Sequence, residues 1–205
     1  MVKIRFSGEL QGRTLWVTGN KVAGYIFNNL YDTFAIPSLP QAIYQMRDGD
    51  FSSIAGPSAN LRWGGPELES GMYYSVICHD AGPLDSRQQI TSRLAKHPEM
   101  VIPFFSELDL GPEIMNLCSR WKSGKASPSQ VGPVYSDVPA LVLTGEYDPT
   151  TPSYWGEHAA KTLGKSYFLM FPGQGHAQLD RPCGKKIAAN FVDNPNVEPA
   201  TACLR

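Results

Sequence analysis

Between residues 136 and 205 the sequence alternates short apolar runs with helix-like stretches, and this alternation restricts the possible fold more than any other feature. Residues 139–145 and 165–171 are apolar in the manner of strands buried on both faces. Helices are expected over 151–163, which begins at a Thr-Pro cap and ends before a glycine, and over about 181–191. Strand, helix, strand and helix at this spacing predict an α/β fold with a parallel βαβ unit.

The upstream residues show shorter and less regular elements. Residues 1–70 are expected to be loops and short helices, including one helix from Ser38 to Gly49. Residues 72–78 are β-branched and aromatic between turn signals, which predicts a strand. A helix is expected over 86–96, and the Ser-, Gly-, Lys- and Pro-rich stretch 120–137 predicts a loop that returns to the C-terminal unit.

Composition excludes several classes of function. A chain of 205 residues, 42% hydrophobic and 18% charged, can form one globular domain with a small appendage. Its net charge of −1 gives no basic surface, so we expect neither nucleic acid nor an anionic membrane as a partner. No apolar run approaches the ~20 residues that cross a bilayer. The first residues also lack the continuous apolar stretch of a signal peptide.

The four cysteines show neither a CxxC spacing nor paired histidines, so a zinc site is not expected. We expect no metal and no other cofactor. Cysteine usage by itself leaves two interpretations open, buried free thiols and disulfides.

One carboxylate and one imidazole follow the two expected C-terminal strands. Asp148 lies in GEYDPTTP just after residues 139–145, and His176 lies in PGQGHAQL just after residues 165–171. Loops at the carboxyl ends of neighbouring parallel strands meet at one edge of the sheet. That arrangement suits a carboxylate that orients an imidazole, which in turn deprotonates a hydroxyl.

Each residue also has a simpler interpretation. Asp148 could fix the turn and help to start the next helix, and His176 could be a solvated loop residue. Their joint position, in the acid-then-histidine order of α/β-hydrolases, favours the catalytic interpretation.

The segment from Asp137 to Leu204 resembles the C-terminal region of the tripeptidyl-aminopeptidase-like α/β-hydrolases, relatives of proline iminopeptidase. The resemblance is carried by VPALVLTGEYDPTTPSYWGEHAAKTLG, the GxGH motif ending at His176, and a closing Pro-Cys and Thr-Ala-Cys-Leu. It covers about a third of the chain. Weaker similarity extends upstream, where VICHDAG with the later CSRW is similar to a cysteine-bearing strand and its downstream partner, and LPQAIYQMRDGDFSSI to a cap helix.

The resemblance implies a partial α/β-hydrolase fold, with residues 1–135 as a mostly helical cap and its return, and 136–205 as the C-terminal core segment. It implies that Asp148 is the triad acid and His176 the general base. Such enzymes release short peptides or residues from a free N-terminus. Asp80, in the Cys-His-Asp run, is our candidate for holding the substrate ammonium, although a solvated loop aspartate is the simpler interpretation.

The resemblance also implies two disulfides, Cys78 with Cys118 and Cys183 with Cys203. Members of this family are typically secreted or bound to the cell envelope, where cysteines become oxidised. The parent protein is therefore expected outside the cytoplasm.

One departure from the family pattern concerns the nucleophile. A nucleophile elbow reads GxSxG between a strand and a helix, whereas the nearest approach here, residues 56–60, reads Gly-Pro-Ser-Ala-Asn. No His-Gly-Gly oxyanion segment is present either. We expect the serine upstream, in an N-terminal half of the same hydrolase that would be the partner of this chain.

Three functions remain open at this stage. The first is a serine exopeptidase acting on peptides, to which this chain contributes the acid and the histidine. The second is a catalytically inactive, truncated hydrolase that serves as a binding or structural module. The third is an esterase or lactonase acting on small esters, because one fold hosts all of these reactions.

Overall fold

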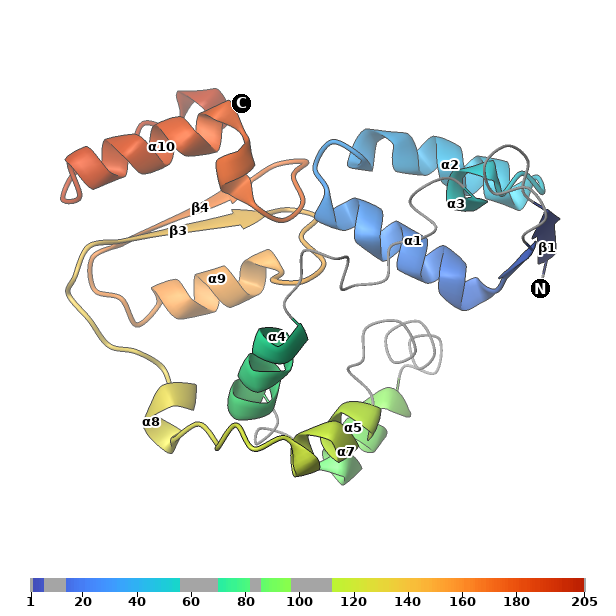
Figure 1. Cartoon of the computed structure of the whole chain (residues 1–205). Coiled ribbons are helices and arrows are strands. Elements are labelled where there is room, and N and C mark those ends of the chain that lie inside the picture. Colours follow the sequence, from blue (N-terminus) through green and yellow to red (C-terminus); the bar gives the residue numbers. More distant parts are fainter. Residues whose placement is uncertain (1, 6–13, 56–69, 82–85, 97–111, 205) are drawn as a thin grey trace. The chain divides into compact units, whose positions relative to one another are not determined.

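The computed structural model describes residues 2–5, 14–55, 70–81, 86–96 and 112–204 (Figure 1). The chain divides into two compact units. One comprises Met1–Tyr25 and Gln45–Gly132, and the other comprises Ile26–Tyr44 and Pro133–Arg205.

The C-terminal unit contains the predicted βαβ arrangement. Strand β3 (Ala140–Gly145) pairs in parallel with β4 (Ser166–Phe171), from Ala140 opposite Ser166 to Gly145 opposite Phe171. Helix α9 (Ser153–Ala160) connects the strands, and α10 (Pro182–Asp193) follows β4. Figure 1 shows α9 and α10 on opposite sides of the two strands. The strands and helices predicted for this region are therefore confirmed.

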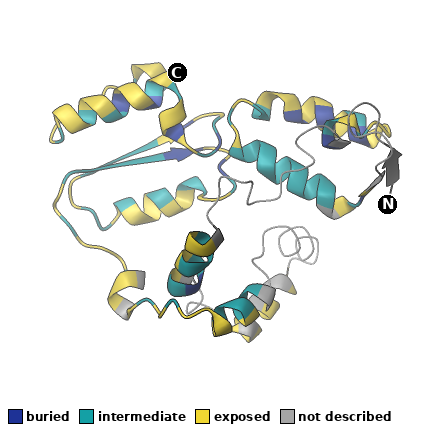
Figure 2. Ribbon diagram, viewed as in Figure 1, coloured by how far each residue is buried: buried dark blue, intermediate teal, exposed yellow. Residues whose placement is uncertain are grey.

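The core of this unit lies where the end of the sheet meets α10. Phe171 at the end of β4 and Ile187 on α10 are both fully buried (Figure 2). On the other face, Gly156 lets α9 approach the sheet, since a Cβ there would lie 2.4 Å from Cγ2 of Thr144. A helix lies on each side of the strands, and their residues are buried or half-buried except Met170, which explains why these strands read as continuous apolar runs rather than alternating ones.

The same unit includes a segment from much earlier in the chain. It contains the end of α1 (Gly19–Tyr31), the 3-10 helix η2 (Ile36–Ser38) and the start of α2 (Leu39–Arg47). Helix α2 was predicted. Helix α1, which is 13 residues long, was not, because its two glycines and repeated asparagines have low helix propensity.

The N-terminal unit is mostly helical among its described residues. Its first two strands, β1 (Val2–Arg5) and β2 (Thr14–Val17), pair antiparallel. Its other elements are the helices α3 (Ser52–Ala55), α4 (Ser70–Val76), α5 (Arg87–Leu94), α7 (Pro112–Arg120) and α8 (Pro128–Val131), together with a π-helix, η4 (Ile77–Ala81). Helix α5 matches the prediction for 86–96. Of the helices that can be described, none combines the length and apolarity needed to cross a membrane.

The strand predicted over residues 72–78 is wrong. This stretch is helical, as α4 runs into the π-helix η4. The helix is tied down by distant partners, because the Ser75 hydroxyl accepts a hydrogen bond from Trp121 Nε1 at 3.0 Å and the Tyr74 ring lies 5.8 Å from the Trp121 ring. These tertiary contacts override a strand propensity that is itself strongly context-dependent.

Two disulfides are present, with the pairing that the family resemblance implies. Cys78 on η4 is bonded to Cys118 on α7, and Cys183 on α10 is bonded to Cys203 on the 3-10 helix η7 (Ala202–Leu204). Each bond closes a loop within a single unit, with sequence separations of 40 and 20 residues.

Removal of either disulfide should destabilise the chain, because a cross-link reduces the conformational entropy of the unfolded state. We expect Cys183→Ser with Cys203→Ser to lower the free energy of unfolding by about 3 kcal/mol, and the Cys78 and Cys118 pair by about 4 kcal/mol. Denaturant unfolding of the two double variants beside the native chain tests this. Superimposable unfolding curves would contradict it.

Candidate active site

Asp148 is held in a turn directly after β3. Its carboxylate is 3% exposed. One oxygen, Oδ1, accepts hydrogen bonds from the backbone amides of Thr150 at 2.8 Å and Thr151 at 2.9 Å. This is the local turn that an aspartate followed by Pro-Thr-Thr favours. The backbone amides of the turn use one carboxylate oxygen and leave the other, Oδ2, for side-chain donors.

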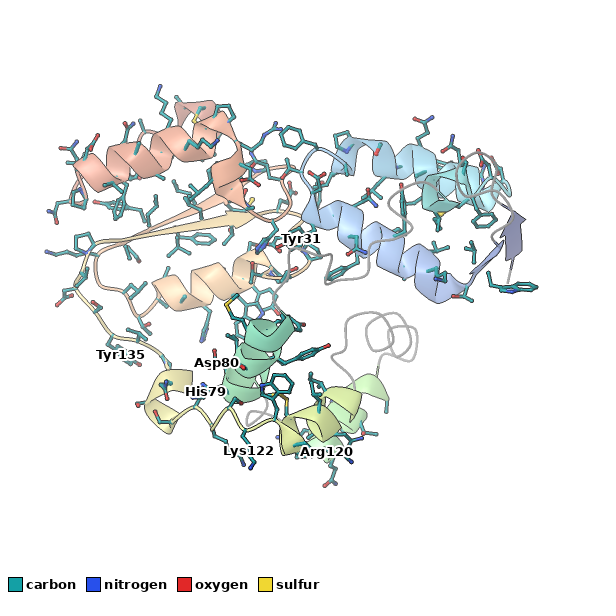
Figure 3. All side chains as sticks on the ribbon, in the orientation of Figure 1. Tyr31, His79, Asp80, Arg120, Lys122 and Tyr135 are labelled. Atoms are coloured by element: carbon teal, nitrogen blue, oxygen red, sulfur yellow. A yellow bond between two sulfur atoms is a disulfide. The ribbon has the colours of Figure 1, made fainter. Side chains whose placement is uncertain are left out.

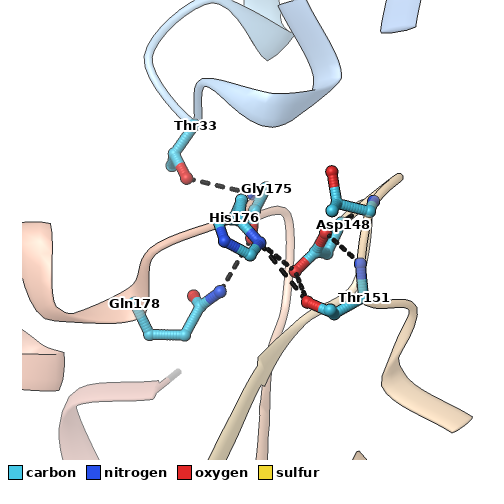
Figure 4. A network of polar contacts seen from close by, with 7 residues as sticks. Thr33, Asp148, Thr151, Gly175, His176 and Gln178 are labelled. Atoms are coloured by element: carbon cyan, nitrogen blue, oxygen red, sulfur yellow. Dashed lines mark hydrogen bonds and ion pairs between the residues drawn. The ribbon is translucent and has the colours of Figure 1, made fainter. Parts of the chain in front are cut away.

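That partner is His176. Its Nδ1 lies 2.8 Å from Asp148 Oδ2 (Figure 4), and its side chain is 29% exposed. Because an ionised carboxylate can only accept, Nδ1 must carry the proton in this contact. In the neutral imidazole, Nε2 then keeps its lone pair and can accept a proton from another group. The pair thus has the polarity of an acid that orients a general base.

Thr151 is a third member of this network, and sequence analysis assigned it no role there. Its hydroxyl donates to Asp148 Oδ2 at 2.8 Å and lies 3.3 Å from His176 Nδ1. Thr151 thus contributes both an amide and a hydroxyl to the buried carboxylate. A threonine three residues after the acid was the available signal, but it is equally expected of a helix start.

The acid loop and the histidine loop are joined by backbone hydrogen bonds. The amides of Glu146 and Tyr147 donate to the carbonyls of Phe171 and Gln174 at 3.1 and 2.9 Å. The Gly173 amide donates to the Glu146 carboxylate at 2.8 Å. These bonds continue the pairing of β3 and β4 beyond the strands, and so fix the distance between the two loops.

The other side of the histidine loop contacts the segment at the end of α1. His176 donates its amide to the Tyr31 carbonyl at 3.0 Å, and Gly175 donates its amide to the Thr33 hydroxyl at 3.0 Å (Figure 4). Glycine is required at 175, since a Cβ would lie 2.2 Å from the Leu30 carbonyl oxygen. Gln178 closes the loop by donating to the Gly175 carbonyl at 2.7 Å.

Electrostatics keep the Asp148 carboxylate ionised. Burial raises its pKa, but hydrogen bonds from Thr151, His176 and the Thr150 amide outweigh burial and hold the pKa below its usual value. Nearby, burial is the main cause of a raised pKa for the Tyr31 phenol, followed by the negative charges of Asp148 and Asp180.

Asp80 lies in the N-terminal unit, on the π-helix η4. Its carboxylate is exposed, and its Oδ1 lies 2.6 Å from Nδ1 of the adjacent His79 (Figure 3). Its assignment to the substrate ammonium stays a prediction.

The Gly-Pro-Ser-Ala-Asn stretch at 56–60 lies outside the described residues. Within the described part of the chain, no group of three or more His, Cys, Asp or Glu side chains could hold a metal ion.

A carboxylate and a histidine on successive loops, at the carboxyl ends of neighbouring parallel strands, are characteristic of the α/β-hydrolases. Residues 105–203 match the model of the TAP-like protein family. This part of the chain is thus the C-terminal region of a TAP-like α/β-hydrolase. Searches of curated proteins and of solved structures found no match.

The Thr151 hydroxyl should contribute more to stability than a hydroxyl bonded to a neutral carbonyl. Thr151→Val keeps the shape but removes a donor to a buried carboxylate, and we expect a loss of about 1.5–3 kcal/mol in the free energy of unfolding. Thr151→Ser keeps the hydroxyl donor and should therefore retain most of the free energy of unfolding. Thr162→Val is the matched control, because the Thr162 hydroxyl donates to the Val134 carbonyl at 2.7 Å. Equal losses in T151V and T162V, measured by chemical denaturation, would contradict the prediction.

The lowered pKa of Asp148 predicts an acid-dependent contribution to stability. A carboxyl whose pKa is lower in the folded than in the unfolded state stabilises the fold above the unfolded value of about 3.9, and loses that contribution as the pH falls through the folded value. The stability difference between the native chain and Asp148→Asn should therefore shrink as the pH is lowered from about 5 toward about 2. Urea unfolding at several pH values measures it; a constant difference would count against an ionised Asp148.

Proposed function

We propose that this chain provides the acid and the general base of a serine hydrolase active site, with Asp148 as the acid and His176 as the base. The observation that carries the proposal is the 2.8 Å contact between Asp148 Oδ2 and His176 Nδ1, which leaves Nε2 as a proton acceptor. Family membership of residues 105–203 supports hydrolase chemistry of the α/β type.

In the proposed reaction, a serine hydroxyl attacks the substrate carbonyl carbon while its proton passes to His176 Nε2. The imidazolium that forms is stabilised by the Asp148 carboxylate. Collapse of the tetrahedral intermediate breaks the bond to the leaving amine, which takes the proton from Nε2, and an acyl-enzyme remains. Water then attacks the acyl group by the same proton transfers in reverse, which releases the acid product and restores the serine.

We place the serine and the oxyanion donors on another segment of the same hydrolase. No GxSxG motif occurs anywhere in the printed sequence. The nearest approach, at residues 56–60, lacks the second glycine and has proline before the serine. The N-terminal half of the hydrolase is therefore the proposed partner of this chain.

The proposed substrates are peptides with a free N-terminus, from which short peptides or single residues are released. Asp80 is the proposed partner of the substrate ammonium, since its side chain is 63% exposed while its Oδ1 contacts His79 Nδ1 at 2.6 Å. A cationic group beside an exposed carboxylate gains modest stabilisation, which suits positioning of a substrate more than tight binding.

A location outside the cytoplasm is part of the proposal. The two disulfides are compatible with an extracellular protein, since such bonds persist in oxidising compartments.

The test uses a fluorophosphonate probe, which labels an activated serine, on this chain alone and on the chain co-expressed with the hydrolase segment that carries GxSxG. We expect labelling of the assembled protein and none of the chain alone. His176→Gln should slow labelling by about 10⁴- to 10⁶-fold. His158→Gln, at an exposed histidine on α9, is the matched control.

Each alternative has its own outcome. Labelling of the chain alone would place the nucleophile within it. Equal labelling of H176Q and H158Q would remove the catalytic role of His176, and an assembled protein without labelling would favour a binding or structural module. Hydrolysis of small esters without release from free N-termini would favour an esterase or lactonase.

A further inference from the structure

Tyr31 covers one face of the His176 imidazole. The two ring centroids lie 4.5 Å apart, with 30° between the ring planes. We infer that Tyr31 is a positioning residue for His176, one that holds the plane of the imidazole while Asp148 holds its Nδ1 edge. This inference rests on the proposed function of His176 as the general base.

The two contacts restrain different motions of the ring. The hydrogen bond from Nδ1 to Asp148 Oδ2, at 2.8 Å, lies along the ring edge and fixes one atom of the ring. Rocking of the ring about that bond would still carry Nε2 away from its target. The Tyr31 ring lies beside the imidazole at a 30° angle and opposes this rocking, because moving the imidazole away from it loses van der Waals contact between the two rings.

The backbone beside the ring is held by the same segment. The His176 amide donates to the carbonyl of Tyr31 itself, so Tyr31 contacts the histidine through both main chain and side chain. Two residues further on, the Thr33 hydroxyl accepts from the Gly175 amide at 3.0 Å. The Arg181 guanidinium lies 4.5 Å from the centre of the Phe34 ring and links this segment to the start of α10. The segment that carries the Tyr31 ring is therefore held in place by contacts of its own.

A positioning role requires accuracy, because misplacing a catalytic group by about 1 Å can lower the rate about 10²-fold. Tyr31 thus differs from a residue that only packs the core: its removal should change the imidazole itself more than the stability of the unit. The spectroscopic state of His176 reports that difference directly.

The experiment is NMR spectroscopy of the whole chain, labelled at its four histidines and with His176 assigned through the H176Q variant. In the native chain we expect a proton on Nδ1 and a nuclear Overhauser effect between the Tyr31 and His176 rings. Tyr31→Leu should remove the upfield displacement of the His176 ring protons and speed exchange of the Nδ1 proton with water. Tyr31→Phe keeps the aromatic ring. It should therefore preserve both the upfield displacement of the His176 ring protons and the slow exchange of the Nδ1 proton.

Tyr135→Leu is the matched control, since Tyr135 belongs to the same unit and is 79% exposed (Figure 3). It should leave the His176 signals unchanged. The inference is overturned if Y31L leaves those signals unchanged, if Y31F loses them as Y31L does, or if the native chain shows no Overhauser effect between the two rings. The last measurement needs no variant, so it decides the matter even if Y31L fails to fold.

A kinetic measurement separates this inference from the proposed function. In the assembled hydrolase, Y31L should lower kcat by about 10- to 100-fold with little change in KM, whereas Y135L should not. The NMR signals need neither a serine nor a substrate. If Y31L changes the His176 NMR signals but H176Q stays fully active, the ring contact is upheld and the catalytic role of His176 is overturned. If Y31L leaves those signals unchanged but H176Q is inactive, only the positioning role of Tyr31 is overturned.

Discussion

The in-register parallel pairing of β3 with β4 is the constraint on which the rest of the site depends. Parallel strands end at the same edge of a sheet, so the loops that follow Gly145 and Phe171 must begin side by side. Backbone hydrogen bonds then extend the pairing into the loops, from Glu146 to Phe171 and from Tyr147 to Gln174. The acid and the histidine meet because the strands beneath them are paired.

A buried carboxylate is costly unless every lone pair has a partner, and Asp148 shows how this chain meets that requirement. Local donors come from the turn itself, through the amides of Thr150 and Thr151. The remaining oxygen accepts from the Thr151 hydroxyl and from His176. The same bonds that keep the carboxylate ionised also fix the tautomer of the imidazole, so the stability of the turn and the chemistry of the histidine share one network.

The predictions from sequence succeeded where local pattern and tertiary structure agree. The apolar runs at 139–145 and 165–171 were recognisable because strands covered by helices on both sides carry apolar residues on both faces. The strand prediction for 72–78 was wrong because β-branched and aromatic residues also occur in helices that distant contacts stabilise. Here those contacts are the hydrogen bond from Trp121 and the disulfide between Cys78 and Cys118. Helix α1 was not predicted because its glycines and asparagines have low helix propensity.

The sequence by itself determined the βαβ order, the loop positions of Asp148 and His176 and, through family resemblance, the pairing of the cysteines. The first two follow from the spacing of apolar runs and polar residues along the chain, whereas the cysteine pairing follows from the resemblance alone. Only the tertiary structure decided that Thr33 would contact Gly175 across a separation of 142 residues, and that Tyr31 would cover the His176 ring. No local pattern encodes such contacts, because they arise when the end of a distant helix packs against the loop.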